Sequence, residues 1–599
     1  MDYSTLLIDL GRFFFASLFL LFLPGFAGSY ALFPRKGVDL WERFILAVSL
    51  SAFLTVFPVL LLDYVFNRGV NFWIVFLNSC FWMVFLSAVC VVGRRLKKNA
   101  SKQKKHVTVK KNEPEKYLLL KALGVVFVLV LNFFLVYSIH NDYGFPFHTD
   151  EWIHLKNAVG IIDLGSVGKS INLEIGFALF LAEFFLVSGV DPVTSYQVLP
   201  AFFMSLTSLM LFASLYKLSG KYWIGLFSML FFAGLKSNIT IMGPWFFVAL
   251  TMCFPLLYSV FYLLGAGFER GSARMLLAAS LGLLAISLIH PCSASFVYPI
   301  VIVYLLSRPG LIKKNILGTL VFFSIPFFSF IYFFKYFWKG SINKTIDFFL
   351  EFIVMPVGRY LPWEYYLFLP QFYGTVGISL AAVGIFAVYA HDKNREKIIV
   401  VWALVTVSLV YIFYNLKYTL LSPYERLLYY ALLSIIPLSG IGLYHLLEWV
   451  YRLISKKNRY LAFIVCASIL LAVCSYHFSG YDKYKSGLYR VIDSKDYAAI
   501  AKLSDKGIVH KKVLAQPHTS FAVYAISRNY VVATSPRTSA PGKTVQDVEK
   551  FFGVSNCTEK AGFLKKYAVD YVYSPKGIDC TGLKEIYRSG GRYIYRAEL

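Results

Sequence analysis

Two adjacent carboxylates, Asp150 and Glu151, lie in the polar segment 141–172, just past the apolar stretch at 117–138. Two histidines, His148 and His154, flank them within a stretch that is also rich in aromatic residues. A carboxylate beside a membrane can act as a general base that removes a proton from an acceptor hydroxyl or amine. Partial burial beside the bilayer would adjust its pKa. We therefore predict that Asp150 is catalytic, together with Glu151.

The same residues allow two other interpretations. Asp150, Glu151 and His148 could together hold a divalent cation such as Mg²⁺ or Mn²⁺, because carboxylates and imidazoles are common metal ligands. Alternatively, the segment could simply begin an amphipathic helix over 150–163. Thr149 would then cap the helix, and the two acids would interact favourably with the helix dipole. Local sequence by itself favours this last interpretation.

The composition places these residues in a membrane protein. Of the 599 residues, 58% are apolar and only 15% are charged, whereas an ordinary soluble protein is nearer half apolar and a quarter charged. This excludes a soluble enzyme, a disordered chain and a disulfide-rich secreted scaffold, and it predicts a polytopic α-helical membrane protein. The net charge of +26 is expected for a membrane protein with many short cytoplasmic loops, because such loops are rich in Lys and Arg. No nucleic-acid-binding motif accompanies it, so no nucleic acid partner is expected.

The segment 94–116 fixes the predicted orientation, because it is rich in Lys and Arg and should remain in the cytoplasm. Counting apolar runs from there gives about 14 spans in the plasma membrane. Three apolar stretches must together make an even number of crossings, namely 173–190, 193–216 and 222–240. The predicted parts are a three-span membrane module at 1–93, the basic linker at 94–116, a larger transmembrane module at 117–479 and an extracytoplasmic domain at 480–599.

The tail from residue 480 is polar and alternates strand-like with helix-like runs, which predicts a small α/β domain. Cys557 and Cys580 are its only cysteines, and an extracytoplasmic compartment permits a disulfide between them. The strand-like runs are Lys512–Ala515, Tyr530–Ala533, Asp570–Tyr573 and Arg592–Arg596. The helix-like runs are Asp493–Leu503, Val545–Phe552 and Glu559–Tyr567.

Cationic side chains on the outer face are the expected partners of an anionic substrate. Arg and Lys both bind phosphate, Arg as a planar fork and Lys as a point charge. Positive charge on this face opposes the orientation rule, so each such residue needs a local reason, and snorkelling to lipid headgroups is the alternative. The residues predicted to contact substrate are His148, His154, Lys236, His290, Arg359, Tyr360, Tyr424 and Arg426. Glu174 and Glu183 are further candidates, because an ionisable group at membrane depth suggests function.

This arrangement resembles the GT-C superfamily of integral-membrane glycosyltransferases, which use polyprenyl-phosphate-linked sugars. The resemblance rests on a span leaving the cytoplasm, an outer loop that opens with Asp150-Glu151 and an interfacial helix, about ten further spans and an outer tail. It covers roughly 115–599. The leading spans, with Pro24-Gly-Phe-Ala-Gly-Ser and Leu40-Trp-Glu-Arg-Phe, resemble an uncharacterised membrane module found mostly in archaea.

The resemblance implies inverting transfer of a sugar from a polyprenyl-phosphate donor to a lipid, glycan or protein acceptor at the outer membrane face. Asp150 would be the base. Arg426, Arg359 or Lys236 would stabilise the negative charge of the departing phosphate. The Trp-Trp-Asp tripeptide of oligosaccharyltransferases is absent, so transfer of a single sugar fits better. Two other functions stay open. A lipid or solute transporter predicts internal repeats, and a non-catalytic scaffold predicts that Asp150-Glu151 is only a helix start.

Overall fold

The structure is a computed structural model. It describes residues 3–34, 38–100, 118–168, 174–238, 241–324, 354–356, 369–390, 395–416, 418–420, 424–488, 490–535 and 542–598. Within these ranges, nine helices are long and apolar enough to cross a membrane, and five shorter apolar helices accompany them. The chain is therefore a multi-pass membrane protein, as its composition predicts.

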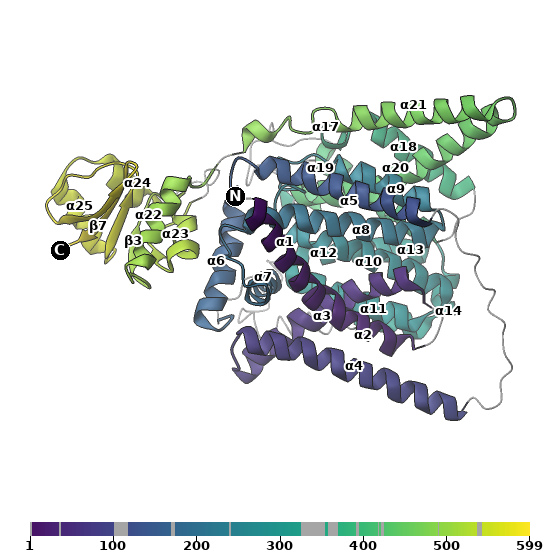
Figure 1. The fold of residues 1–599 in the computed structure, drawn as a ribbon, viewed down its shortest axis with the longest axis horizontal. Helices are drawn as coiled ribbons and strands as arrows, with labels where there is room; N and C mark the ends of the chain where they lie inside the picture. The colour runs from purple at the N-terminus through teal and green to yellow at the C-terminus, as the bar shows by residue number, and fades with distance from the viewer. Residues whose placement is uncertain are drawn as a thin grey trace.

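The N-terminal module consists of helices that pack on one side of the bundle (Figure 1). Its elements are α1 (Tyr3–Ser17), the π-helical η1 (Leu18–Phe22), α2 (Leu23–Leu32), α3 (Leu40–Phe66) and α4 (Phe72–Ala100). Helix α3 is the most deeply placed, and it contacts α8, α10 and α11 of the larger module. Asp39 caps α3 by accepting the backbone N–H of Glu42, whose side chain accepts the N–H of Asp39 in return.

The larger module contributes most of the bundle. Its first elements are α5 (Leu118–His140), α6 (Thr149–Leu164), α7 (Ile175–Ser188), η2 (Tyr196–Val198), α8 (Leu199–Ser219) and α9 (Tyr222–Ala233). Next come α10 (Ala249–Arg270), α11 (Ala273–Ile289), α12 (Pro291–Ser295), α13 (Val297–Leu306) and α14 (Gly310–Lys314). The last are β1 (Val354–Pro356), α17 (Leu369–Tyr373), α18 (Thr375–Ala390), α19 (Lys397–Leu416), β2 (Tyr418–Leu420), α20 (Tyr424–Ser455) and α21 (Arg459–Phe478).

The bundle has two distinct ends (Figure 1). The domain end lies next to the C-terminal domain, and the distal end lies opposite, where α4 finishes and α14 is found. Arg270 at the end of α10 binds Glu42 of α3 with a 2.5 Å ion pair at the distal end, and Lys314 of α14 donates to the Glu269 carbonyl. Basic segments from several loops therefore share the end of the bundle that is farther from the C-terminal domain.

The ambiguous apolar region resolves into one transverse helix and two that run along the bundle. Figure 1 views α7 nearly end-on beside α6, whereas α8 and α9 run lengthwise. Helix α7 has only 14 residues, which is too short for a full crossing of about 20. Helix α9 has 12 residues and is also shorter than a full crossing, so α8, with 21 residues, is the one of these three helices that is long enough to span a membrane. The even number of crossings in this region stays a prediction.

The C-terminal domain is a five-stranded mixed sheet with helices on both faces. Its strand order is β4-β3-β5-β7-β6, with β3 parallel to β4 and β5, and β7 antiparallel to β5 and β6. The strands are β3 (Lys512–Leu514), β4 (Tyr530–Val531), β5 (Tyr571–Ser574), β6 (Leu583–Ser589) and β7 (Arg592–Ala597). The helices are η4 (Lys485–Gly487), α22 (Ser494–Asp505), α23 (Ser520–Ser527), α24 (Lys543–Gly553) and α25 (Cys557–Lys566). Cys557 and Cys580 form a disulfide.

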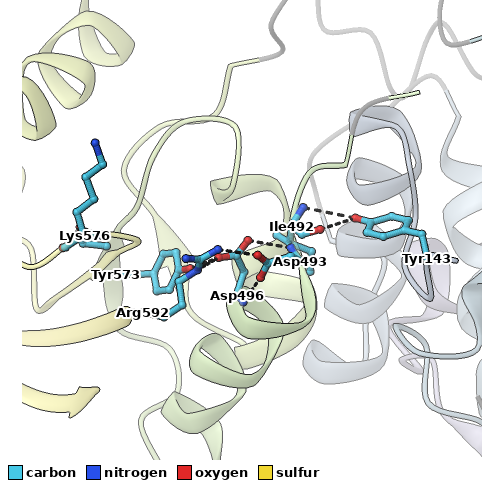
Figure 2. A network of polar contacts seen from close by, with 8 residues as sticks. Tyr143, Ile492, Asp493, Asp496, Tyr573, Lys576 and Arg592 are labelled. Atoms are coloured by element: carbon cyan, nitrogen blue, oxygen red, sulfur yellow. Dashed lines mark hydrogen bonds and ion pairs between the residues drawn. The ribbon is translucent and has the colours of Figure 1, made fainter. Parts of the chain in front are cut away.

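A polar network ties this domain to the loop that precedes α6 (Figure 2). Tyr143 donates its hydroxyl to the Ile492 carbonyl at 2.8 Å. The next residue, Asp493, caps α22 and binds Arg592 of β7 at 2.6 Å. Asp496 also pairs with Arg592 and accepts the Tyr573 hydroxyl. The network therefore links the central sheet to the loop through α22.

A second contact joins the domain to α6 itself. Asp163, in the last turn of α6, accepts the Tyr524 hydroxyl of α23 at 3.2 Å. His510 and Arg528 lie 3.8 and 3.9 Å from the same carboxylate. Helix α6 therefore begins at the candidate site and ends against the C-terminal domain.

Candidate active site

Helix α6 begins at the acidic pair, and the two acids have different surroundings. The cap is His148, whose Nδ1 accepts the Asp150 N–H at 3.0 Å, so the expectation of a Thr149 cap is wrong by one residue. Glu151 is fully buried and accepts three backbone N–H groups, from Phe147 and His148 at 3.0 Å each and from Phe247 at 2.9 Å. Its carboxylate therefore fixes the start of α6 against the segment before α10.

Asp150 faces a cavity of about 190 Å³ at the domain end. Four other polar side chains line it, those of His154, Glu174, His290 and Arg426, and the first residues of α10 form part of the wall. These groups come from α6, the start of α7, the α11–α12 junction and the start of α20. Four of the predicted site residues are thus brought together from distant parts of the sequence.

Asp150 and Arg426 lie next to each other in the lining of the cavity. Nη2 of Arg426 lies 4.0 Å from Oδ2 of Asp150, which is longer than a hydrogen bond. The Asp150 side chain keeps 38% of its surface exposed and the Arg426 side chain 20%. A carboxylate and a guanidinium at this spacing can contact two different parts of one bound molecule.

Glu174 lies between two imidazoles. Its Oε2 is 3.4 Å from Nε2 of His154, and its Oε1 is 3.4 Å from Nε2 of His290. Nδ1 of His290 accepts the Ser293 N–H at 3.2 Å, so in the neutral ring the proton is on Nε2 and points to Glu174. The carboxylate thereby orients at least the His290 ring.

Two residues of this group were not predicted from sequence. The Ser293 hydroxyl lies 2.7 Å from Nδ1 of His290 and 2.9 Å from the Tyr430 hydroxyl. Serine and tyrosine are too common in membrane helices to attract notice. The only sequence signal was the spacing of three residues between His290 and Ser293, which allows the histidine to cap the short helix α12.

The expected cation site does not fit the structure. Both oxygens of Glu151 accept backbone N–H groups, and Nδ1 of His148 also accepts one. Burial lowers the pKa of His148, which agrees with its role as a neutral acceptor. Across the described ranges, no group of three or more His, Cys, Asp or Glu side chains is arranged to hold a metal ion.

The remaining predicted contacts are not among the cavity residues that the structure describes. Lys236 does not line the cavity; its carbonyl accepts the Tyr429 hydroxyl at 3.1 Å. Arg359 and Tyr360 fall outside the described residues, and for Tyr424 only the backbone is described, as the first residue of α20. Glu183 is buried in α7 outside the cavity, with no hydrogen-bond partner among the described residues.

Glu151 leads to a prediction about stability and pH. Replacing it with Ala would leave three buried N–H groups without acceptors, at roughly 1–3 kcal/mol each, so we expect a large drop in thermal stability. Burial raises the pKa of Glu151 to about 8 from its usual 4.5. The unfolded chain therefore releases this proton first, and stability should fall as pH rises from about 4.5 to about 8. Thermal unfolding of wild type and Glu151→Ala across this range measures both effects. A pH dependence that is unchanged in the variant would contradict the assignment.

Comparison with known proteins gives two results. Residues 5–113 match a family described as a domain of unknown function, DUF8471. Most of the chain is similar to the oligosaccharyltransferase of Archaeoglobus fulgidus. The apo form aligns with a TM-score of 0.53 at 11% identity, over 77% of this chain and 70% of that one. The fold is of the GT-C type.

A second structure of the same enzyme, tethered to an acceptor peptide with an NVT sequon, aligns over 77% of this chain and 69% of that one, with a TM-score of 0.51 and 12% identity. A third, in complex with zinc and sulfate, covers 75% and 67%, with a TM-score of 0.50 and 11% identity. At these identities the likeness concerns the GT-C fold. The comparison with curated protein sequences finds no match.

Proposed function

We propose that this GT-C-type protein is a membrane glycosyltransferase that transfers one sugar from a polyprenyl-phosphate donor to a hydroxyl or amine acceptor, with inversion. The observation that carries the proposal is the cavity in which Asp150 faces Arg426 at the domain end. A base for the acceptor and a cation for the leaving phosphate are the two charges that this reaction needs, and here both line one cavity.

In the proposed reaction, Asp150 removes the proton from the acceptor as its oxygen or nitrogen attacks the anomeric carbon of the sugar. The bond between that carbon and the phosphate oxygen breaks on the opposite side, which inverts the configuration. The departing polyprenyl phosphate takes the bonding electron pair, and its negative charge is stabilised by Arg426. The N-terminus of α10 at the cavity wall adds to this field.

The other cavity residues have supporting roles in this proposal. Glu174, with His154 and His290, would bind hydroxyl groups of the sugar, because a carboxylate accepts hydrogen bonds and an imidazole ring can both accept and donate them. Glu151 positions Asp150 rather than reacting, since its oxygens are occupied by backbone N–H groups. The acceptor stays open among a lipid, a glycan and a protein. The proposed orientation places the domain end outside the plasma membrane, in contact with membrane lipids.

Purified full-length protein in lipid nanodiscs tests the proposal directly. It would be incubated with a panel of radiolabelled polyprenyl-phosphate monosaccharides and with lipid, glycan and peptide acceptors. We expect donor-dependent labelling of one acceptor class, with no labelling from nucleotide sugars. Absence of transfer and of donor hydrolysis with every donor would reject the assignment and favour the transporter or scaffold alternatives.

A further inference from the structure

The N-terminal module reaches the far end of α6 through one buried carboxylate. Asp63, in the last turn of α3, is 5% exposed. Its Oδ2 accepts the Val167 N–H at 2.8 Å and the Ser166 hydroxyl at 3.1 Å. Both donors lie immediately after α6. A buried charge-assisted bond of this kind is among the stronger hydrogen bonds in proteins, so it fixes the position of the chain that leaves α6.

The loop between α3 and α4 makes a second contact with the same place. The Val70 N–H donates to the carbonyl of Gly165 at 2.6 Å. Gly165 is the left-handed C-cap of α6, with φ +64°. Gly69 approaches so closely that a Cβ on it would lie 2.7 Å from the Gly165 oxygen. The two backbones therefore touch where only glycine can be accommodated.

The module is itself anchored to the bundle, so it can serve as a fixed support. At the distal end, the buried Glu42 of α3 accepts the Tyr262 hydroxyl at 2.6 Å and pairs with Arg270, both from α10. Ser259 of α10 donates to the Ile45 carbonyl of α3 at 3.0 Å. Helix α3 thus connects the central helix α10 to the end of α6.

The module also supports α7. Helix α7 packs against α1, α3 and α4, with the Phe13 and Phe184 rings 5.4 Å apart. Glu174, the N-cap of α7, is the cavity carboxylate that lies between the two histidines. Both acidic groups of the cavity, Asp150 and Glu174, therefore belong to helices that the module contacts.

We propose that the N-terminal module is a brace for the active site, and that Asp63 is a positioning residue that fixes α6 and thereby Asp150. Glu151 secures one end of α6 to the bundle, and Asp63 with the Gly69–Val70 backbone secures the other. This gives a role to a family whose function is undescribed. The role in catalysis rests on the proposed function, whereas the mechanical role does not.

The test compares Asp63→Ala with Asp63→Asn in the full-length protein. Ala removes the acceptor for Val167, whereas Asn keeps an oxygen that can accept its N–H. Hydrogen–deuterium exchange over 158–168 should be at least about tenfold faster in the Ala variant and within about threefold of wild type in the Asn variant. In the transfer assay, kcat should fall about 10- to 100-fold in the Ala variant with little change in KM, because misplacement of a catalytic group acts mainly on the chemical step.

Asp39→Ala provides a matched control. Asp39 belongs to the same helix α3, caps its start and pairs with Lys217 of α8 at the distal end. Its loss should lower thermal stability without changing exchange over 158–168. If Asp63→Ala does not fold, Gly69→Ala replaces it, because the added Cβ would push against the Gly165 carbonyl while leaving Asp63 intact.

The outcomes separate the two proposals. Exchange over 158–168 that stays at the wild-type rate in Asp63→Ala, or in Gly69→Ala where that variant is used, overturns the brace. An equal loss of kcat in Asp63→Ala and Asp39→Ala would mean that Asp63 contributes only to the stability of the fold. That result also overturns the brace proposal. If wild type shows no transfer at all, the proposed function fails, and the exchange measurements alone still decide whether the module supports α6.

Discussion

Asp150→Asn should reduce sugar transfer by about 10²- to 10⁴-fold, the usual contribution of a general base. Asn has nearly the same shape as Asp but cannot accept the proton of the attacking group. The Asp150 side chain is 38% exposed and the helix cap is made by its backbone N–H and His148, so the fold should be retained. Initial rates of transfer, together with thermal unfolding of the same sample, measure both expectations.

Asp142→Asn is the control for this variant. Asp142 is a carboxylate of the loop that precedes α6, but it pairs with Lys485 and does not line the cavity. We expect its transfer rate to stay within about twofold of wild type, as is usual for exposed pairs of this kind. Full activity of Asp150→Asn would remove the proposed base and leave Asp150 as part of a helix start.

Arg426→Ala should lower kcat by about 10²- to 10³-fold, which is the usual effect of deleting one group that stabilises developing negative charge. Arg426→Lys should recover part of the loss, because it keeps the charge but not the planar fork. The loss should be measured with saturating donor, since a cation that acts on the leaving phosphate changes the chemical step more than ground-state binding.

Lys485→Ala is the matched control, because Lys485 is another cation at the domain end but lies outside the cavity. Its rate should be unchanged. A loss in Arg426→Ala confined to KM would show that Arg426 binds the donor without assisting departure of the phosphate. Unchanged kinetics in both Arg426 variants would show that another cation stabilises the phosphate, and Arg359 would be the next residue to replace.

Local patterns in the sequence predicted most helices and strands of the C-terminal domain. The four predicted strands correspond to β3, β4, β5 and β7, and the three predicted helices to α22, α24 and α25. Strand β6 (Leu583–Ser589) was missed, because charged residues interrupt its alternation and most of its residues are exposed or only partly buried. Helix α23 was missed because its eight residues give a short, weak periodic signal.

The charged residues of the candidate site could be predicted from the sequence, but the contacts between them could not. Asp150 and Arg426 stood out because charged residues are rare beside apolar runs, and the structure places them next to each other in the lining of one cavity. The role of Glu151 could not be predicted, because one of its donors is the N–H of Phe247, which lies 96 residues away in the chain. The contacts of Glu174 with His154 and His290 could not be predicted for the same reason, because they depend on how distant helices pack.

The contact between Asp163 and the C-terminal domain affects how truncated forms of this protein should be interpreted. Removing the domain would leave the Asp163 carboxylate without Tyr524 and its two basic neighbours, and would deprive the Tyr143 hydroxyl of its carbonyl partner. Both residues lie on the segment that carries Asp150. An inactive truncated protein would therefore be no proof that the domain touches substrate, because the deletion disturbs the membrane part directly. Point variants on the sheet face away from α6 are the appropriate way to ask what the domain binds.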